Sequence, residues 1–229
     1  MCARFTLRSR PELVVELFDF ELPMALEPRF NVAPTQAVLA VRLSEEGPRE
    51  FVRLRWGLVP SWATDLKMGV KLLNARAETV AEKPSFRDAF RKRRCLIAAD
   101  GYYEWQTENG IKQPYFIHRA DRKPFAFAGL WEHWVDPAGE IIQTCTILTT
   151  GANDVLKALH DRMPVVIPKN DHTLWLDTAV KDGKQLTPLL RPAADDELTY
   201  YPVTPKVNSW KFDNPACVEP INENHGTSS

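Results

Sequence analysis

The second residue of the chain is a cysteine, and a cysteine at this place can have an unusual chemistry. Removal of the initiator methionine is expected when the next residue is as small as Cys2. The chain would then begin with a free α-amine and a thiol on adjacent carbons, which titrate near ~8 and ~8.5 and are both partly nucleophilic at neutral pH. Such a pair captures aldehydes, because the amine forms a Schiff base and the thiol closes a thiazolidine ring. The alternative is a Met-Cys start that arises by chance.

A second group of polar residues has the spacing of one strand face. Asn74, Arg76 and Glu78 alternate within the segment N-A-R-A-E, so a strand would place all three side chains on the same side. An amide next to a guanidinium is suited to orient a phosphate or a sugar oxygen. The polar outer face of a half-buried strand would show the same pattern.

A carboxylate lies in an aromatic stretch at residues 99–105. Glu104 is flanked by Tyr103 and Trp105, and desolvation there would raise its pKa, as a general acid or base requires. Trp105 also offers a stacking face for a nucleobase. The alternative is an edge-strand glutamate beside core aromatic residues.

One histidine stands out from the other four in the chain. His160 follows a predicted short helix and precedes Asp161-Arg162 and a proline, which indicates a loop of the kind that often carries functional side chains. A loop histidine with purely structural hydrogen bonds is the alternative.

The elements that position these residues are predicted to be short. Hydrophobic periodicity and turn signals indicate helices at 11–21, 84–94, 153–159 and 171–177. They indicate strands at 38–43, 50–56, 72–78, 95–99 with its continuation at 102–106, 115–118, 125–133, 141–150, 165–167 and 199–203. Asn109-Gly110 is a strong hairpin signal. We predict a single α+β domain over residues 1–207, with a curved, barrel-like, mainly antiparallel β core and several short peripheral helices. Residues 208–229 are interpreted as a polar, poorly structured tail.

Composition excludes several classes of protein. With 44% hydrophobic and 26% charged residues in 229, the chain is globular, and it has no apolar run long enough for a membrane span and no secretory signal. Its four cysteines show no metal-ligand spacing, and no GxGxxG, GxSxG or HExxH motif is present. We therefore expect a reduced, cytoplasmic protein without metal or cofactor.

The net charge of −1 hides an uneven distribution. Residues 1–119 carry 19 Lys+Arg against 15 Asp+Glu, which allows a basic face. The basic run 91–94 is interpreted as a solvated helix end.

The order and spacing of several short motifs resemble one protein family. They are M-C-x-R-F at the start, N-V-A-P-T at 31–35, W-G-L-V-P-S-W at 56–62, N-A-R-A-E at 74–78, A-D-G-Y-Y-E-W at 99–105, T-T-G-A-N at 149–153 and H-D-R-M-P at 160–164. From Cys2 to about residue 205 the chain resembles the SOS response associated peptidase (SRAP) family of abasic-site processing proteins.

The resemblance implies a DNA damage function. The protein would recognise abasic sites in single-stranded DNA, near junctions with duplex DNA, and cross-link to them through Cys2, with lyase and autoprotease activities also implied. Asn74 would sense the abasic sugar, Glu104 would promote ring opening and proton transfer, and His160 would lie beside the sugar and its phosphate. The residues that would contact DNA are Arg4, Arg76 and Arg162 at phosphates, and Pro34, Trp62 and Thr149 in the groove, in addition to Trp105. We expect a monomer, associated with the nucleoid when bound to damaged DNA.

The chain departs from the family pattern at one position, and its motifs also allow two other functions. The family usually has glycine where this chain has Ala3; if that glycine needs a positive φ, the methyl group would cost about 1 kcal/mol and shift Cys2. One rival is a self-processing cysteine peptidase with His160 as the base for Cys2. The other is a non-catalytic module that binds single-stranded DNA through arginines and tryptophans.

Overall fold

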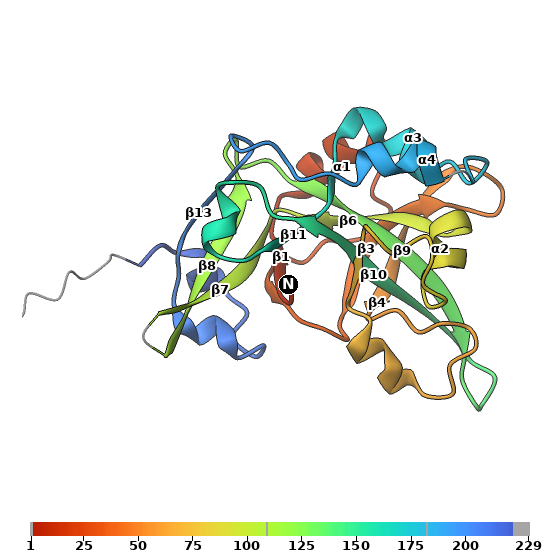
Figure 1. Ribbon diagram of the computed structural model, residues 1–229, viewed down its shortest axis with the longest axis horizontal. Coiled ribbons are helices and arrows are strands. Elements are labelled where there is room, and N and C mark those ends of the chain that lie inside the picture. Colours follow the sequence, from red (N-terminus) through yellow and green to blue (C-terminus); the bar gives the residue numbers. More distant parts are fainter. Residues whose placement is uncertain (1, 109, 182, 222–229) are drawn as a thin grey trace, which may run out of the picture.

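The computed structural model describes residues 2–108, 110–181 and 183–221, and its centre is a closed β-barrel (Figure 1). The strands follow the order β10-β4-β3-β6-β9, and pairing of β9 with β10 closes the ring. All neighbours are antiparallel except β10 and β4. The barrel strands are β3 (Ala37–Leu43), β4 (Arg49–Trp56), β6 (Arg94–Ala99), β9 (Phe125–Val135) and β10 (Ile141–Gly151).

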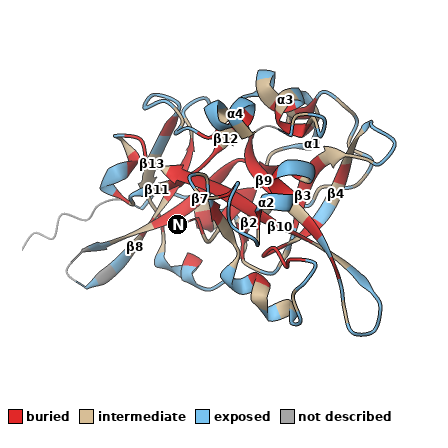
Figure 2. Ribbon diagram, turned by 45° about the vertical axis from the view of Figure 1, so that its right-hand side comes forward, coloured by how far each residue is buried: buried red, intermediate tan, exposed pale blue. Residues whose placement is uncertain are grey.

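The two faces of the barrel strands have separate hydrophobic cores. In β6, Cys95, Ile97 and Ala99 pack with apolar residues of all four other barrel strands, whereas Leu96 and Ala98 belong to a second cluster with the helices. This alternation places the first cluster inside the barrel and the second outside it. Figure 2 shows the buried strands surrounded by an exposed periphery.

Short helices cover the outer face of the barrel. Apolar residues of all four pack into the outer cluster, and three of them, α1, α3 and α4, gather along one side (Figure 1). The helices are α1 (Pro11–Phe18), α2 (Arg87–Lys92), α3 (His172–Leu176) and α4 (Gly183–Leu186). None of the helices in the described ranges has the length and apolar character needed to cross a bilayer.

A second, five-stranded sheet brings the N-terminal strand against the barrel. Phe5 lies with its ring centroid 5.2 Å from Trp56 and 5.8 Å from Phe127, both in the barrel. The buried Asp100 fixes the chain after this strand, because its carboxylate accepts hydrogen bonds from the backbone N–H groups of Arg8 and Ser9, at 2.6 Å each. The strand order is β13 (Leu198–Pro202), β8 (Ile111–Arg119), β7 (Gly101–Glu108), β1 (Phe5–Leu7) and β2 (Arg29–Val32).

Three very short strands add to the ends of the barrel strands β9 and β10. β5 (Asn74–Arg76) pairs with β10 in parallel, β11 (Arg162–Pro164) pairs with β10 in antiparallel, and β12 (Val166–Ile167) pairs with β9. Thr149 of β10 is the register partner of both Arg76 and Pro164. β10 therefore brings together the segments 74–78 and 160–164, which are far apart in the sequence.

The predicted fold class is confirmed: the chain is an α+β domain with a barrel-like, mainly antiparallel core and short peripheral helices. The helix expected at 153–159 is reduced to a single 3-10 turn, Leu156–Ala158. Other 3-10 turns are Leu66–Lys71, Lys169–Asp171, Thr187–Leu189, Pro205–Asn208 and Pro215–Val218.

The prediction of a poorly structured tail is wrong for residues 208–221. The buried Asn31 donates hydrogen bonds from Nδ2 to the carbonyls of Val207, Ser209 and Phe212, at 3.1, 3.0 and 2.8 Å, and Cys217 is fully buried. The segment is polar in sequence, but its backbone is held by side chains of β2. Residues 222–229 of the expected tail lie outside the described residues.

The interpretation of residues 91–94 as a solvated helix end is wrong for Arg94. Its guanidinium is buried and directs its N–H groups to backbone carbonyls of α2 and of the segment 175–180. The acceptors are Trp175 at 2.6 Å, Phe90 at 2.7 Å, Arg91 at 3.0 Å, Val180 at 3.1 Å, and Asp177. Arg94 therefore ties α2 and α3 to the barrel, which a run of four cations does not reveal.

Candidate active site at the N-terminal cysteine

Cys2 is fully buried three residues before the start of β1, and Asn74 holds its backbone. The Nδ2 group of Asn74 donates a hydrogen bond to the Cys2 carbonyl at 2.8 Å. The Cys2 Sγ atom lies 3.7 Å from the carbonyl oxygen of Arg4. Asn74 Oδ1 is buried and makes no hydrogen bond within the described part of the chain, so an acceptor remains available beside Cys2.

Glu104 lies on the strand that pairs with β1. The β1–β7 register sets Phe5 opposite Tyr102, and the Tyr103 N–H donates to the Arg4 carbonyl at 3.0 Å. Glu104 is the next residue of β7 after Tyr103, so the same register places it beside the segment from Cys2 to Arg4. The Glu104 side chain is buried, and burial raises the pKa of its carboxyl group above the ordinary value.

The carboxylate of Glu104 affects the thiol of Cys2. Burial first, and then the nearby negative charge of Glu104, raise the pKa of the Cys2 thiol well above its ordinary value. The thiol is therefore protonated at neutral pH in this environment, and it needs a proton acceptor when it reacts.

His160 lies in the loop between the turn Leu156–Ala158 and β11. Its Nδ1 atom is 2.9 Å from the Arg162 backbone nitrogen and 2.7 Å from Asp161 Oδ1. The neutral ring accepts the Arg162 N–H at Nδ1, whereas the protonated ring donates from Nδ1 to Asp161. Burial lowers the pKa of His160, which favours the neutral form.

This loop faces the strand that carries Glu104. Gln106 of β7 donates from Nε2 to the Ala158 carbonyl at 3.2 Å, and the charge of Asp161 contributes to the raised pKa of Glu104. The structure thus brings Cys2, Asn74 and Glu104 together and places the His160 loop beside them.

Two of the arginines predicted to contact phosphate flank the carboxylate of Glu78. Arg76 is exposed on β5. Arg162 makes a bidentate ion pair with Glu78, with Nη1–Oε1 and Nη2–Oε2 distances of 2.5 and 2.9 Å. Its Nη2 also donates to the carbonyl of Thr149 at 2.6 Å, and Thr149 itself is buried. The side chain of Thr149 and the guanidinium group of Arg162 are therefore both already engaged within the protein.

The third predicted arginine holds the C-terminal segment. Arg4 donates to Asn31 Oδ1 at 3.0 Å and to the carbonyls of Val207 and Asn208 at 2.7 and 3.1 Å. Trp105 donates from Nε1 to Asn208 Oδ1 at 2.7 Å. Sequence reasoning missed Asn208, because it lies at the start of the segment interpreted as a tail.

The two remaining predicted groove residues lie nearer the surface. Trp62 is 58% exposed in the segment after β4, and Pro34 is partly exposed in the turn between β2 and β3. An exposed tryptophan is available for stacking.

Alanine after Cys2 is accommodated without a left-handed backbone. Among the described non-glycine residues, positive φ values occur at Asp19, Thr35 and Arg122, and Ala3 is not one of them. The strain that a positive φ would impose on Ala3 therefore does not arise.

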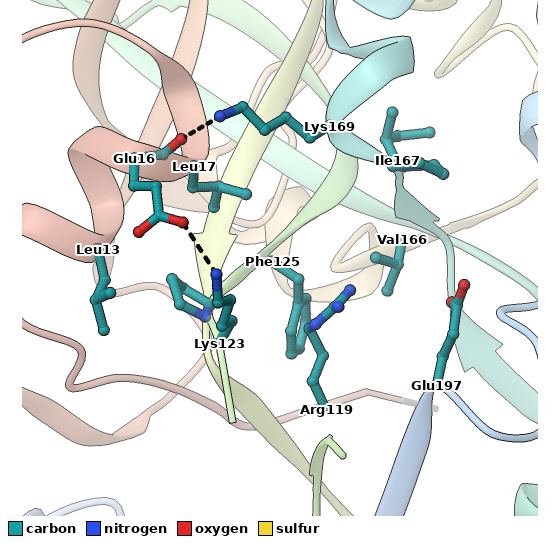
Figure 3. Close-up of a pocket in the computed structure, with 12 residues that line it drawn as sticks. Leu13, Glu16, Leu17, Arg119, Lys123, Phe125, Val166, Ile167, Lys169 and Glu197 are labelled. Carbon is teal, nitrogen blue, oxygen red and sulfur yellow. Dashed lines mark hydrogen bonds and ion pairs between the residues drawn. The ribbon is translucent and has the colours of Figure 1, made fainter. Parts of the chain in front are cut away.

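A cavity of about 210 Å³ lies away from Cys2, between α1, the end of β8, the start of β9, and β12 (Figure 3). Its lining mixes apolar and charged side chains. Two of its cations already have partners: Lys123 pairs with Glu16 at 3.0 Å, and Lys169 donates to the Glu16 carbonyl at 2.6 Å. Within the described ranges no group of three or more His, Cys, Asp or Glu side chains is arranged to hold a metal ion.

The fold and the site define a class of barrel proteins in which a buried cysteine at the second position is held by an amide and flanked by a buried carboxylate. The family model described as SOS response associated peptidase (SRAP) matches residues 1–210, and the chain belongs to this family.

Relatives of known name and structure cover most of the chain. It is 41% identical over 223 residues to the abasic site processing protein YoqW of Bacillus subtilis, covering 96% of this chain and 99% of YoqW. It is 34% identical to the abasic site processing protein HMCES of Gallus gallus, covering 78% of this chain but only 60% of HMCES. A crystal structure of a protein from Bacteroides thetaiotaomicron superposes with a TM-score of 0.86 at 25% identity, covering 96% of this chain and all of the other.

Proposed function

We propose that the protein captures abasic sites in single-stranded DNA by a covalent bond to Cys2 and so shields the lesion during the DNA damage response. The observation that carries the proposal is the contact of Asn74 with the Cys2 backbone beside the buried carboxyl group of Glu104. The names of the relatives, which are abasic site processing proteins, support the choice of substrate. The proposal requires that Met1 is removed.

The reaction balances with the loss of one water molecule. The Cys2 amine adds to the aldehyde carbon of the ring-opened deoxyribose, and water leaves to give an imine. The thiol then adds across the C=N bond: sulfur bonds to carbon, and the thiol proton goes to nitrogen. The resulting thiazolidine lacks the electrophilic imine, so it resists hydrolysis better than a Schiff base.

Glu104 is the proposed proton carrier. An abasic sugar is mostly a closed hemiacetal, and a protonated carboxyl group can donate to the ring oxygen as the ring opens. The raised pKa of Glu104 keeps its proton available closer to neutral pH. The carboxylate that remains can accept the proton that the attacking amine loses.

Asn74 and His160 are proposed to orient the reactants. Asn74 holds the Cys2 carbonyl with Nδ2, and its buried Oδ1 offers an acceptor for a sugar hydroxyl. His160, in the neutral form favoured by burial, donates from Nε2 to the sugar or its phosphate.

The proposed path of the DNA strand combines charge and stacking. Arg76, with Arg162 next to it, would contact phosphates, and Trp62 would stack on a base. Pro34 and Trp105 are proposed to line the path, whereas the buried Thr149 is proposed to act only through its carbonyl, which holds Arg162. Arg4 would contribute only through donors that it does not already direct to Asn31 and to residues 207–208.

The test is a denaturing gel and a mass measurement. The protein is incubated with an abasic single strand, an intact strand, an abasic site at a duplex junction and a peptide, with Cys2→Ala as the control. The proposal expects an adduct of protein without Met1 plus DNA minus one water, absent with Cys2→Ala, which should still bind DNA. An adduct of normal yield in Cys2→Ala would contradict it, as would peptide cleavage without adduct or binding without adduct. Strand scission on the same gel tests lyase activity.

A further inference from the structure

Glu78 occupies an unusual place between the two arginines that lie nearest the proposed DNA path. Its carboxylate makes both bonds of a bidentate pair with Arg162. Its pKa is held below the ordinary value, first by this hydrogen bond and also by the charges of Arg162 and Arg76. One anion thus offsets part of the charge of two cations.

The pairing leaves Arg162 little capacity for another anion. Nη1 and Nη2 are directed to Glu78, Nη2 also to the Thr149 carbonyl, and Nε is buried. The side chain of Arg162 is 14% exposed, while that of Glu78 is 52% exposed. The carboxylate is therefore the solvent-facing partner, and a phosphate that approaches from solvent meets Glu78 first.

We propose that Glu78 is a specificity-determining counter-charge that DNA phosphate must displace from Arg162, so that the protein binds undamaged single strands only weakly. This inference rests on the proposed binding of single-stranded DNA. A bidentate guanidinium fork fits either a carboxylate or a phosphate, but not both at once. Because binding to intact strands is weak, the protein stays on DNA only where Cys2 reacts covalently with a lesion.

A purely structural role for Glu78 predicts the opposite result. If the pair only braced β5 against β11, its loss would loosen the site and weaken DNA binding. If Glu78 competes with phosphate, its neutralisation frees a cation and strengthens binding. The sign of the change therefore separates the two roles.

The experiment measures dissociation constants for an intact single strand over a range of salt concentrations. Glu78→Gln is compared with wild type, Arg162→Gln and the double variant. We expect Glu78→Gln to bind roughly three- to tenfold more tightly at low salt and to raise the slope of log K against log salt by about 0.7, the value for one more phosphate contact. In the Arg162→Gln background the gain should disappear. Glu82→Gln, which removes an exposed carboxylate four residues away, is the matched control and should change affinity less than twofold, that is, by under about 0.4 kcal/mol.

Each outcome is decisive. Equal or weaker binding by folded Glu78→Gln overturns the inference, as does a gain that persists without Arg162. If Glu78→Gln does not fold, Glu78→Asp keeps the charge but shortens the side chain, and it should show a smaller gain in affinity; no gain overturns the inference. Failure of the wild-type protein to bind any single strand would instead refute the proposed function on which the inference rests.

Discussion

The side-chain amide of Asn74 donates a hydrogen bond to the backbone carbonyl of Cys2 over a distance of 2.8 Å. Asn74 is fixed by the pairing of β5 with β10, and the segment that follows Cys2 is fixed by the pairing of β1 with β7. The bond thus connects the edge of the barrel to the N-terminal strand of the other sheet. It fixes the backbone that carries both proposed nucleophiles, the amine and the thiol of Cys2.

Replacing Asn74 tests this positioning. Asn74→Ala removes one hydrogen bond to the Cys2 carbonyl, and we expect about fivefold slower cross-linking, since one such bond contributes about 1 kcal/mol. Affinity for intact single strands should change little, because phosphate contacts dominate it. Single-turnover cross-linking rates and binding constants check both parts. A variant that cross-links at the wild-type rate would show that the bond has no role in the reaction.

Glu104→Gln tests the proton carrier. Glutamine keeps the shape of the side chain but cannot titrate, so cross-linking should slow by roughly 10²- to 10⁴-fold while DNA affinity is retained. The wild-type rate should also follow the titration of this carboxyl group, whose pKa is raised by burial, and this pH dependence should be lost in the variant. An unchanged rate would make Glu104 a structural residue of β7 and transfer the role to His160.

Local sequence pattern predicted most of the barrel, because its strands alternate strictly between two cores. The segment 95–99 was predicted as a buried strand, and β6 confirms it. The strands β1, β2 and β11 were not predicted. Each has only three or four residues, which is too short to show an alternation of apolar and polar side chains. They form because partners distant in sequence satisfy their backbone groups.

Charge and composition were poor guides to burial. Arg94 ends a run of four cations, yet its donors meet carbonyls from residues more than 80 positions away. Asn208 was assigned to a tail, yet it accepts from both Arg4 and Trp105. Such contacts join residues that are far apart in the sequence, so the local sequence pattern does not predict them. The proximity of Cys2, Asn74 and Glu104 could be predicted only through the family resemblance.

Arg94 is expected to be the most sensitive of the four basic residues at 91–94. Arg94→Met leaves several buried carbonyls without donors, and each unsatisfied group costs about 1–3 kcal/mol. We expect at least about 3 kcal/mol of destabilisation in urea unfolding. Arg91→Met, at an exposed position in α2, is the control and should change stability by less than about 0.5 kcal/mol. Equal effects of the two variants would contradict the structural role of Arg94.

His172 is expected to make the fold sensitive to acid. It is buried against Phe18, with Nε2 3.2 Å from the Ile167 carbonyl, and burial lowers its pKa from 6.5 to about 4. Between these values the unfolded chain binds more protons than the folded one, so stability falls as the pH decreases from about 6.5 to 4. The full loss corresponds to about 3 kcal/mol.

The check is the pH dependence of unfolding free energy in His172→Gln. Its slope between pH 4 and 6.5 should be smaller than that of wild type, because the variant lacks the buried imidazole that gains a proton on unfolding. A slope that is unaltered in His172→Gln would show that other groups govern acid sensitivity.

The two arginines beside Glu78 are expected to differ in their contribution to DNA binding. Arg76 is exposed, whereas Arg162 is compensated by Glu78 before DNA arrives. Arg76→Ala should therefore weaken binding to intact and abasic strands by similar factors and reduce the salt slope by about 0.7. Arg162→Ala removes a cation that is already paired, so its effect on affinity and salt slope should be smaller. Arg191→Ala, an exposed arginine outside the proposed path, is the control and should leave both quantities unchanged. A larger effect of Arg162→Ala than of Arg76→Ala would show that Glu78 does not offset the charge of Arg162 when DNA binds.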